Sequence, residues 1–540
     1  MIHMEESVYI TGKDAFLHTL VIGPTGSGKT SRILMPMVYQ VLKAYANGNK
    51  VGMTLIEPKG DFAQDVVEQC ERMGIPYHYI DPLRDDSASF NPLIGDPQQV
   101  SEMIRTVLRR MFGRQKAFFA QVQETAARNT TKLLKMVHGD NITLLDLARA
   151  LRNVETIQKH LADYKQMYGS KDDLAEYFEI EVIKNKENYQ MFATGLRMQL
   201  EDIVGNAHLQ RIFLGKNPVD LRKHLEEGGV LVVNTAMGEL GKLGDVFGIF
   251  VLMNLQNAVF SRPGTEETRR PHYLFVDEFP RYVNPDIERL LAIGRSFRCA
   301  CIFAVQGLSQ LDVDGNKQFR NVVLTNCRNK IVFGGINYEE AEYMSHEFGK
   351  EFGIAESKKY DTILGRKVMF ADGISESEAE RLRITATQIK EAPAFHFYYQ
   401  LVRDGQPLPP GLAEGRVLNK KTGELVLLRP NPLNRLAEKV KRMIEKTKPA
   451  MKAQPQVTSE PAQEEPQALL ETDHQEAIAS GNQNSELSYQ TTAAPAPDLA
   501  PKYEKESEAK AELHPEPEKQ EDKPEQEEWF VLIDKTEKQT

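Results

Sequence analysis

Eight consecutive residues between an apolar run and a helix-like stretch have the composition of a loop that binds phosphate groups. They match the pattern G-x-x-x-x-G-K-[ST] and are Gly23, Pro24, Thr25, Gly26, Ser27, Gly28, Lys29 and Thr30. The glycines let backbone N–H groups curl around an anion, and the following helix directs its positive end to the same point. In such a loop the lysine reaches the β- and γ-phosphates, and the threonine hydroxyl ligates Mg²⁺. The sequence therefore predicts a nucleotide site.

Two carboxylates follow a second apolar run, Tyr273–Val276, as Asp277 and Glu278. Taken alone, this pattern also fits a strand that runs into an exposed turn. Together with the phosphate loop, it predicts that Asp277 lies beside the Mg²⁺ shell and that Glu278 polarises the attacking water. A glutamate after the aspartate favours hydrolysis over phosphoryl transfer to a small substrate.

Two further observations bear on the nucleotide and its hydrolysis. Asn329-Lys330 continues as Ile-Val and lacks the aspartate that reads guanine in the NKxD motif, which favours ATP over GTP. Gln306 follows the apolar run Cys301–Val305, at the edge where ligands meet parallel sheets. Its amide is expected to sense the γ-phosphate or to position water, although a solvated glutamine at a strand end has the same pattern.

The elements that must position these residues alternate between short apolar runs and helical stretches. Strands are predicted at His18–Ile22, Lys50–Ile56 and Tyr77–Ile80, with helices at Ser31–Ala46 and Phe62–Met73 between them. Further strands are predicted at Gly229–Asn234, Tyr273–Val276, Cys299–Val305 and Asn329–Phe333. This alternation predicts an α/β fold with a parallel central sheet covered on both faces, as in RecA-like P-loop domains.

From about Pro97 to Ala207 no strand is predicted, and apolar residues recur every three or four positions, as in helices. The prediction is thus a nucleotide-binding domain at 1–96 and 208–430, interrupted by an inserted all-α domain at 97–207. A basic amphipathic helix is predicted at 431–448, and a disordered acidic tail at 449–540. The tail cannot bury enough apolar surface to order itself.

The net charge of −10 belongs to the tail, because residues 451–540 hold 8 basic against 21 acidic side chains. The remaining 59 basic and 56 acidic residues leave the body close to neutral. One apolar island, Trp529–Ile533, interrupts the tail. It is either a docking motif that folds on a partner or a fortuitous cluster.

No signal peptide is visible, and the longest apolar run, Gly248–Leu255, is too short to cross a bilayer. The sequence is expected to be cytoplasmic, with any membrane attachment supplied by a partner.

The order of these motifs resembles that of the type IV secretion coupling proteins, the TraG/TraD-type ATPases of conjugative DNA transfer within the FtsK–HerA group. The resemblance covers about Thr19 to Pro407. Besides the phosphate loop and the Asp277-Glu278 strand, it is carried by Ile56–Asp61 (IEPKGD), Ile80-Asp81-Pro82, Phe90–Leu93, Leu231–Asn234, Gly294-Arg295, Gln306 with Ser309–Leu311, and Gly335–Gly349.

This resemblance implies that Lys29, Thr30, Asp277 and Glu278 form an ATP site with Mg²⁺. Gln306 would then be its sensor, and Arg295 a finger that acts on the neighbouring subunit. It further implies a ring, typically a hexamer, around single- or double-stranded DNA, with the helical module receiving relaxosome or substrate proteins and the ring docked to a type IV secretion channel.

Two departures from the family pattern stand out. Glu57 replaces the usual aspartate of the IEPKGD stretch. The family's N-terminal transmembrane helices are absent from this sequence, whose phosphate loop begins at Gly23. We therefore expect recruitment to the inner face of the cell membrane by a separate adaptor subunit.

DNA-contacting residues are weakly specified. Basic clusters occur at Arg105, Arg109, Arg110, Arg114 and Lys116, and at Arg435, Lys439, Lys441 and Arg442. Each is either a phosphate-contacting surface or a solvated helix face, and the second interpretation is favoured.

Three functions fit the sequence. The first is an ATP-driven DNA translocase coupled to a secretion channel, which the helical insert favours. The second is a cytoplasmic translocase without a secretion role. The third is a receptor or adaptor in which ATP drives assembly only.

Overall fold

The computed structural model describes residues 8–112, 117–284, 286–313, 315–363, 366–419, 422–426 and 528–533. The predicted basic helix at 431–448 lies outside these residues, as does the predicted acidic tail apart from Glu528–Ile533. Arg114, Lys116 and the second basic cluster also lie outside them.

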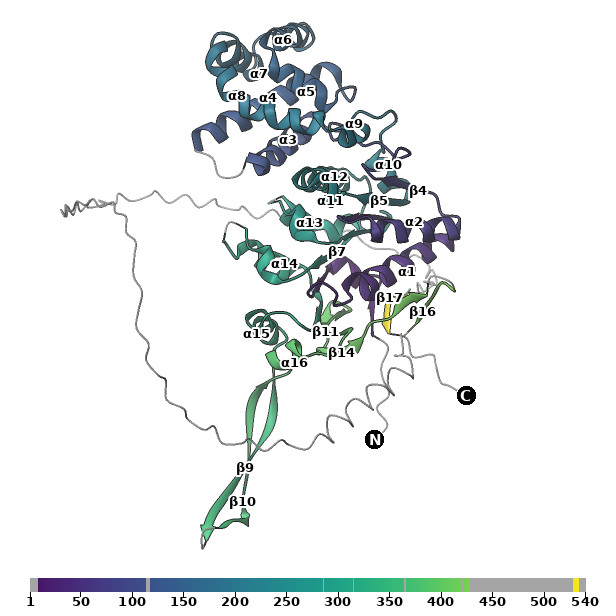
Figure 1. Cartoon of the computed structure of the whole chain (residues 1–540), viewed down its shortest axis with the longest axis vertical. Helices are drawn as coiled ribbons and strands as arrows, with labels where there is room; N and C mark the ends of the chain where they lie inside the picture. Colours follow the sequence, from purple (N-terminus) through teal and green to yellow (C-terminus); the bar gives the residue numbers. More distant parts are fainter. Residues whose placement is uncertain are drawn as a thin grey trace, which may run out of the picture. The chain divides into compact units, whose positions relative to one another are not determined.

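The centre of the fold is a nine-stranded sheet with the order β14-β11-β8-β2-β7-β6-β3-β5-β4 (Figure 1). The seven strands from β8 to β4 run parallel to one another, and β11 pairs antiparallel with both β8 and β14. The strand bounds are β2 Thr19–Ile22, β3 Gly52–Glu57, β4 Tyr77–Ile80, β5 Val230–Asn234, β6 His272–Val276, β7 Cys299–Val305, β8 Asn329–Phe333, β11 His396–Gln400 and β14 Gly411–Glu414. The predicted α/β class with a parallel central sheet is confirmed.

The strand order separates the two halves of the predicted site. β7 lies between β2, which leads into the phosphate loop, and β6, which leads into Asp277. All three strands run in the same direction, so their carboxyl ends meet at one edge of the sheet. Gln306, directly after β7, is thereby placed between the loop and the two carboxylates.

Apart from β4, the parallel strands are buried at every position because both faces of the sheet are covered. Side chains alternate between two cores: Leu20 and Ile22 of β2 join one, and Val21 joins the other. The Val21 core also contains residues of α1 (Met35–Ala46) and α2 (Asp61–Met73). The Leu20 core contains residues of α12 (Lys242–Phe260), α13 (Ile287–Ile293) and α14 (Gln318–Asn326).

Helix boundaries follow local chemistry. α2 ends at Gly74, whose φ of 66° is the left-handed conformation that terminates helices. The N–H groups of Gly74 and Ile75 return to the carbonyls of Glu71 and Cys70, which satisfies acceptors at the helix end.

Every regular element described between β4 and β5 is helical. The elements are α3 Pro97–Phe112, α4 Ala117–His138, α5 Leu144–Arg152, α6 Val154–Tyr168, α7 Asp173–Tyr177, η3 Phe178–Ile183, α8 Lys186–Gly205, α9 Ala207–Phe213 and α10 Leu221–Glu227. Their buried side chains belong to the same continuous core as α12 and one face of the sheet. The exact limits of an inserted domain at 97–207 stay a prediction.

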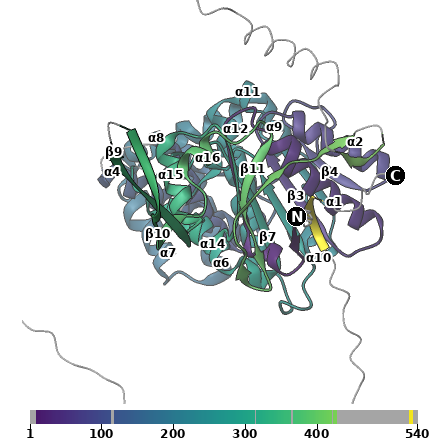
Figure 2. The ribbon, with the colours of Figure 1, turned by 90° about the horizontal axis from the view of Figure 1, so that it is seen from below.

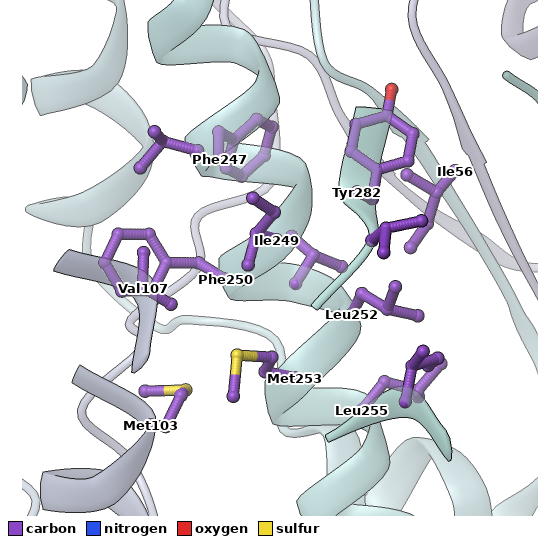
Figure 3. Packing of buried hydrophobic residues seen from close by; sticks show 14 of the residues in the cluster. Ile56, Met103, Val107, Phe247, Ile249, Phe250, Leu252, Met253, Leu255 and Tyr282 are labelled. Atoms are coloured by element: carbon purple, nitrogen blue, oxygen red, sulfur yellow. The ribbon is translucent and has the colours of Figure 1, made fainter. Parts of the chain in front are cut away.

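α12 joins the helical segment to the sheet. Met103 and Val107 of α3 approach one side of it, and Ile56 of β3 and Tyr282 lie on the other side (Figure 3). Within the described part of the chain, α12 is the one helix that is long and apolar enough to cross a membrane, yet 78% of its apolar window is buried inside the protein. Its hydrophobicity is that of a core helix.

The remaining elements lie before β2, around the site, or after β8. They are β1 Val8–Thr11, η1 Asp14–Leu17, η2 Lys29–Leu34, α11 Met237–Leu240, η4 Phe279–Tyr282, η5 Gly294–Phe297, η6 Leu308–Leu311, α15 Tyr338–Glu347, β9 Lys350–Ile363, β10 Arg366–Leu382, α16 Ala386–Lys390, β12 Val402–Arg403, β13 Gln406–Pro407, β15 Val417–Asn419, β16 Glu424–Val426 and β17 Glu528–Ile533. β9 and β10 form a long antiparallel hairpin (Figures 1 and 2). β17 pairs antiparallel with β1.

Candidate nucleotide site

The phosphate-binding pattern lies between the carboxyl end of β2 and the start of η2. Two of its glycines are required by the backbone. Gly28 has a φ of 105°, which L side chains rarely adopt, and a Cβ on Gly23 would lie 2.7 Å from Ser27 Oγ and 2.8 Å from Phe333 Cβ. The loop is therefore compact, as a cradle of backbone N–H groups must be.

Lys29 is buried beneath this loop. Its Nζ donates to the carbonyl oxygens of Gly23 at 2.5 Å and Pro24 at 3.2 Å. Burial lowers the pKa of Lys29, while the negative charges of Glu278 and Asp277 act in the opposite direction. The ammonium group is thus held inside the loop and close to both carboxylates.

Thr30 and Asp277 are in direct contact. The Thr30 hydroxyl donates to Asp277 Oδ2 at 2.9 Å, across the width of β7. The other oxygen, Oδ1, accepts the N–H of Glu278 at 2.9 Å. Burial raises the pKa of Asp277, and the hydrogen bond from Thr30 opposes that rise. A hydroxyl and a carboxylate side by side at the loop have the chemistry of a Mg²⁺ site.

Glu278 is held by two donors that follow different strands. Gln306 Nε2 lies 3.0 Å from Oε1 and 2.9 Å from Oε2, and Lys59 Nζ forms an ion pair with Oε1 at 3.7 Å. Glu278 also has a φ of 50°, in the left-handed region that non-glycine residues seldom adopt. Such strain is frequent where a side chain is oriented for function.

Lys59 lies in the IEPKGD stretch and was not among the residues predicted for the nucleotide site. The signal that identifies its position is structural. Lys59 follows the end of β3, and β3 is the parallel neighbour of β6, which ends before Glu278. The two side chains therefore meet at the same sheet edge.

Glu57 orders the turn that presents Lys59. Its carboxylate accepts the N–H groups of Lys59 at 2.8 Å, Gly60 at 2.5 Å and Ala63 at 3.2 Å. Burial nevertheless raises the pKa of Glu57 to about 7, and the nearby Asp277 charge adds to the rise. A glutamate at the position where the family pattern has aspartate thus closes the turn by backbone hydrogen bonds.

The described residues fit a nucleotide with magnesium. The φ of 80° at Gly26 is one that L side chains rarely adopt, and the space beside this residue is open, with no neighbour within 4 Å of the place where its Cβ would be. Among the described residues, Ser27 Oγ is buried without a hydrogen-bond partner. The donor set of one ammonium group, one hydroxyl and two carboxylates is the set that phosphate and Mg²⁺ require.

Arg295 lies apart from this cluster. It is part of η5, which precedes β7. The other predicted site residues follow the carboxyl ends of β2, β6 and β7. A seven-residue strand spans about 23 Å, so Arg295 does not reach the phosphate loop of its own chain. Its guanidinium pairs with Glu266 at 3.5 Å, and both side chains are half exposed.

The described members of the first basic cluster lie on α3, and two of them pair with acidic side chains. Arg105 lies 3.1 Å from Glu102, and Arg109 lies 3.5 Å from Glu124. These pairs favour the interpretation as a solvated, ion-paired helix face.

Comparisons with family models and with solved structures relate the chain to known proteins. The family model described as the type IV secretion-system coupling protein DNA-binding domain matches residues 7–409. The unbound monoclinic form of the bacterial conjugative coupling protein TrwBdeltaN70 is similar with a TM-score of 0.53 and 16% identity, over 79% of this chain and 92% of that chain. The complex of the plasmid coupling protein TrwB with ADP and Mg²⁺ gives the same values. None of the curated protein sequences compared with the chain matches it.

The fold and the site define a P-loop nucleoside triphosphatase with a strand inserted between the phosphate-loop strand and the strand of acidic residues. The family model matches most of the chain and identifies the family within this class of proteins. The chain belongs to the type IV secretion-system coupling proteins. At 16% identity, the likeness to TrwB bears on the fold, which is RecA-like as predicted.

Proposed function

We propose that this protein is an ATP-hydrolysing coupling protein that recruits DNA, or a nucleoprotein substrate, and pumps it into a type IV secretion channel. The observation that carries the proposal is the hydrogen bond between Thr30 and Asp277, with Lys29 and Glu278 beside it, at one edge of the sheet. In a member of the coupling protein family, that arrangement supports ATP turnover as the source of movement.

Each site residue has a distinct proposed role. Lys29 leaves the carbonyls of its own loop to bind the β- and γ-phosphates, and the loop from Gly23 to Thr30 surrounds them with N–H groups. Thr30 and Asp277 would hold Mg²⁺. Mg²⁺ supplies charge neutralisation on the phosphate oxygens when it is bound. The structures of TrwB with ADP and Mg²⁺ and with an ATP analogue support this choice of ligands.

Glu278 is proposed as the general base, and Gln306 as the group that controls it. In the structure, the amide of Gln306 donates to both carboxylate oxygens of Glu278, so these oxygens already accept hydrogen bonds from the protein. Release of the amide toward a γ-phosphate would free the carboxylate to accept a proton from water. The pair thereby links nucleotide occupancy to the readiness of the base.

The proposed working form is a homo-oligomer, a hexamer as the resemblance implies. Arg295, which lies far from its own phosphate loop, is proposed to act in the site of a neighbouring subunit. The proposed location is the inner face of the cell membrane, where a partner subunit and the secretion channel hold the ring. The burial of α12 supports attachment through a partner.

A Glu278→Gln variant tests the chemistry. We expect it to bind ATP with Mg²⁺ about as tightly as the wild type and to lose at least about 100-fold in turnover, because the amide cannot accept the proton. Lys29→Ala is the matched variant that loses binding as well. Wild-type turnover in Glu278→Gln would contradict the assignment of the base.

The motor itself is tested by turnover with and without single- and double-stranded DNA, together with the mass of the assembly. DNA-stimulated turnover in an oligomer supports pumping. If substrate transfer in cells survives Glu278→Gln, the protein acts as an adaptor and ATP drives assembly only. If turnover is stimulated but transfer through the channel does not depend on this protein, it is a translocase without a secretion role.

A further inference from the structure

The chain's last described strand returns to its first. β17, Glu528–Ile533, pairs antiparallel with β1, Val8–Thr11, in a two-stranded sheet of its own. The paired positions include Tyr9 with Val531 and Ile10 with Phe530, and the register is irregular on both sides of these pairs. More than 500 residues of sequence separate the two partners.

β1 has no other strand partner among the described residues, because the sheet that contains it consists of β1 and β17 alone. A single strand without a partner leaves a row of backbone N–H and C=O groups open to another extended peptide. Addition of a strand satisfies these groups independently of sequence, and the side chains then provide selectivity.

The surface beneath this pair is apolar. Val8 and Ile10 are buried and belong to the core that α1 shares with the sheet. β17 contacts α1 as well as β1, and Figures 1 and 2 both show this strand, in yellow, beside α1. A two-stranded ribbon alone is marginal in water, so the contact with α1 is needed for its stability.

The sequence of β17 suits this surface. Residues 529–533 read WFVLI and form an apolar island in a tail that has 21 acidic side chains between 451 and 540. Among the described residues, β17 pairs with β1 alone. The apolar surface on β1 and α1 is a suitable partner for an apolar strand.

We propose that β1 and the adjoining surface of α1 form a docking site for strand addition, and that its occupant is the Glu528–Ile533 segment of the same chain. The Glu528–Ile533 segment is then tied to the body at β1. The apolar island is held by its own protein and becomes available to another partner only when it leaves β1.

A cysteine pair tests the contact in the full-length chain. Tyr9→Cys with Val531→Cys places two thiols at directly opposed positions, and the four native cysteines are all buried. We expect an intrachain disulfide that forms at least about tenfold faster than in the control pair Tyr9→Cys with Ser488→Cys, because strand pairing raises the effective concentration. Equal rates would overturn the proposal. Predominant cross-linking between chains would overturn its assignment to the same chain.

Hydrogen exchange gives a second measurement that does not depend on cysteines. A Phe530→Pro/Val531→Pro chain lacks one N–H donor on each edge of β17, since successive N–H groups of a strand point to opposite sides. We expect the amides of Val8–Thr11 to exchange at least about tenfold faster than in wild type.

The matched control is a Ser485→Pro/Glu486→Pro chain, which should leave the amides of Val8–Thr11 as in wild type. The amides of Thr19–Ile22 report that the body remains folded in both variants. Unchanged protection of Val8–Thr11 in the Phe530→Pro/Val531→Pro chain would show that β17 does not occupy this site.

Discussion

At the scale of single residues, Glu278 is the most constrained group of the site. It is nearly buried, it has a left-handed backbone, and it contacts both an amide and an ammonium group. The two contacts have different consequences. An amide can exchange one acceptor for another, whereas an ammonium group stabilises the ionised carboxylate that a general base must be.

Lys59 is therefore expected to support turnover without being required for it. A Lys59→Met variant should lose about tenfold in ATP turnover, less than Glu278→Gln, because the ammonium group is half exposed and its charge is partly screened. Lys59→Arg retains the charge and should keep most of the activity. Steady-state turnover and nucleotide binding distinguish these effects, and a Lys59→Met enzyme with wild-type turnover would remove Lys59 from the mechanism.

The raised pKa of Glu57 predicts that the stability of the folded chain depends on pH. Its pKa is about 7 in the folded chain and near 4.5 when unperturbed, so between these values the folded state binds more protons than the unfolded state. The contribution of Glu57 to the free energy of unfolding therefore falls as pH rises from about 4.5 to about 7, and is constant above that.

In Glu57→Gln this contribution is absent, so urea unfolding at pH 5 and pH 7.5 should show a smaller loss of stability with pH than in wild type. Glu239→Gln, at an exposed glutamate, is the control and should retain the wild-type dependence. The same loss in Glu57→Gln as in wild type would mean that Glu57 is already ionised at pH 5.

At the scale of elements, α12 determines how the helical segment is attached to the sheet. It packs on α3 through residues such as Phe250, and Gly248 lets it approach Tyr282 (Figure 3). Tyr282 is fully buried, and its hydroxyl is 2.8 Å from Thr235 Oγ1. The ring cannot move aside without loss of that hydrogen bond.

Gly248→Ala should destabilise the protein by about 1–3 kcal/mol, because the new Cβ would lie 2.3 Å from the Tyr282 ring. Helix propensity alone would favour alanine by about 1 kcal/mol. Gly238→Ala is the matched change in α11, with no neighbour within 4 Å of the new Cβ. Thermal and denaturant unfolding should separate the two, and equal stabilities would mean that α12 shifts freely against η4.

At the scale of the whole molecule, the position of Arg295 suggests that the site is completed by a second copy of the chain. The residue precedes β7, while the phosphate loop lies beyond the other end of that strand. Head-to-tail contacts between identical subunits form a closed ring when the rotation closes, and each subunit then offers a different surface to each neighbour.

Subunit mixing tests this arrangement. Arg295→Ala and Lys29→Ala proteins should each lose most of their ATP turnover, on the order of 10³-fold for the arginine. Mixed before assembly, they should regain part of the activity, because an intact loop of one subunit meets an intact arginine of the other. Mixtures of Glu278→Gln with Lys29→Ala should regain none, since both defects lie in the same site. No recovery in the first mixture would assign Arg295 to a structural role.

Much of the fold was predictable from the sequence because its strands are buried on both faces. Runs such as Cys299–Val305 and Asn329–Phe333 are buried at every position, and their observed bounds equal the predicted ones. The antiparallel strand β11 was not predicted. Its sequence HFYYQ is short, and only the edge offered by β8 turns it into part of the sheet.

The phosphate loop is a property of the sequence, since eight adjacent residues specify both its conformation and its chemistry. The contacts of Glu278 are a property of the tertiary structure. Side-chain periodicity shows which segments are buried but not which strands are neighbours, so the insertion of β7 between β2 and β6, and with it the approach of Gln306, follows only from the packed sheet.

The same distinction applies to the ends of the chain. The sequence shows an apolar island in an acidic tail and leaves its partner open. The partner, β1, is set by long-range strand pairing, whose backbone hydrogen bonds carry no local sequence signal.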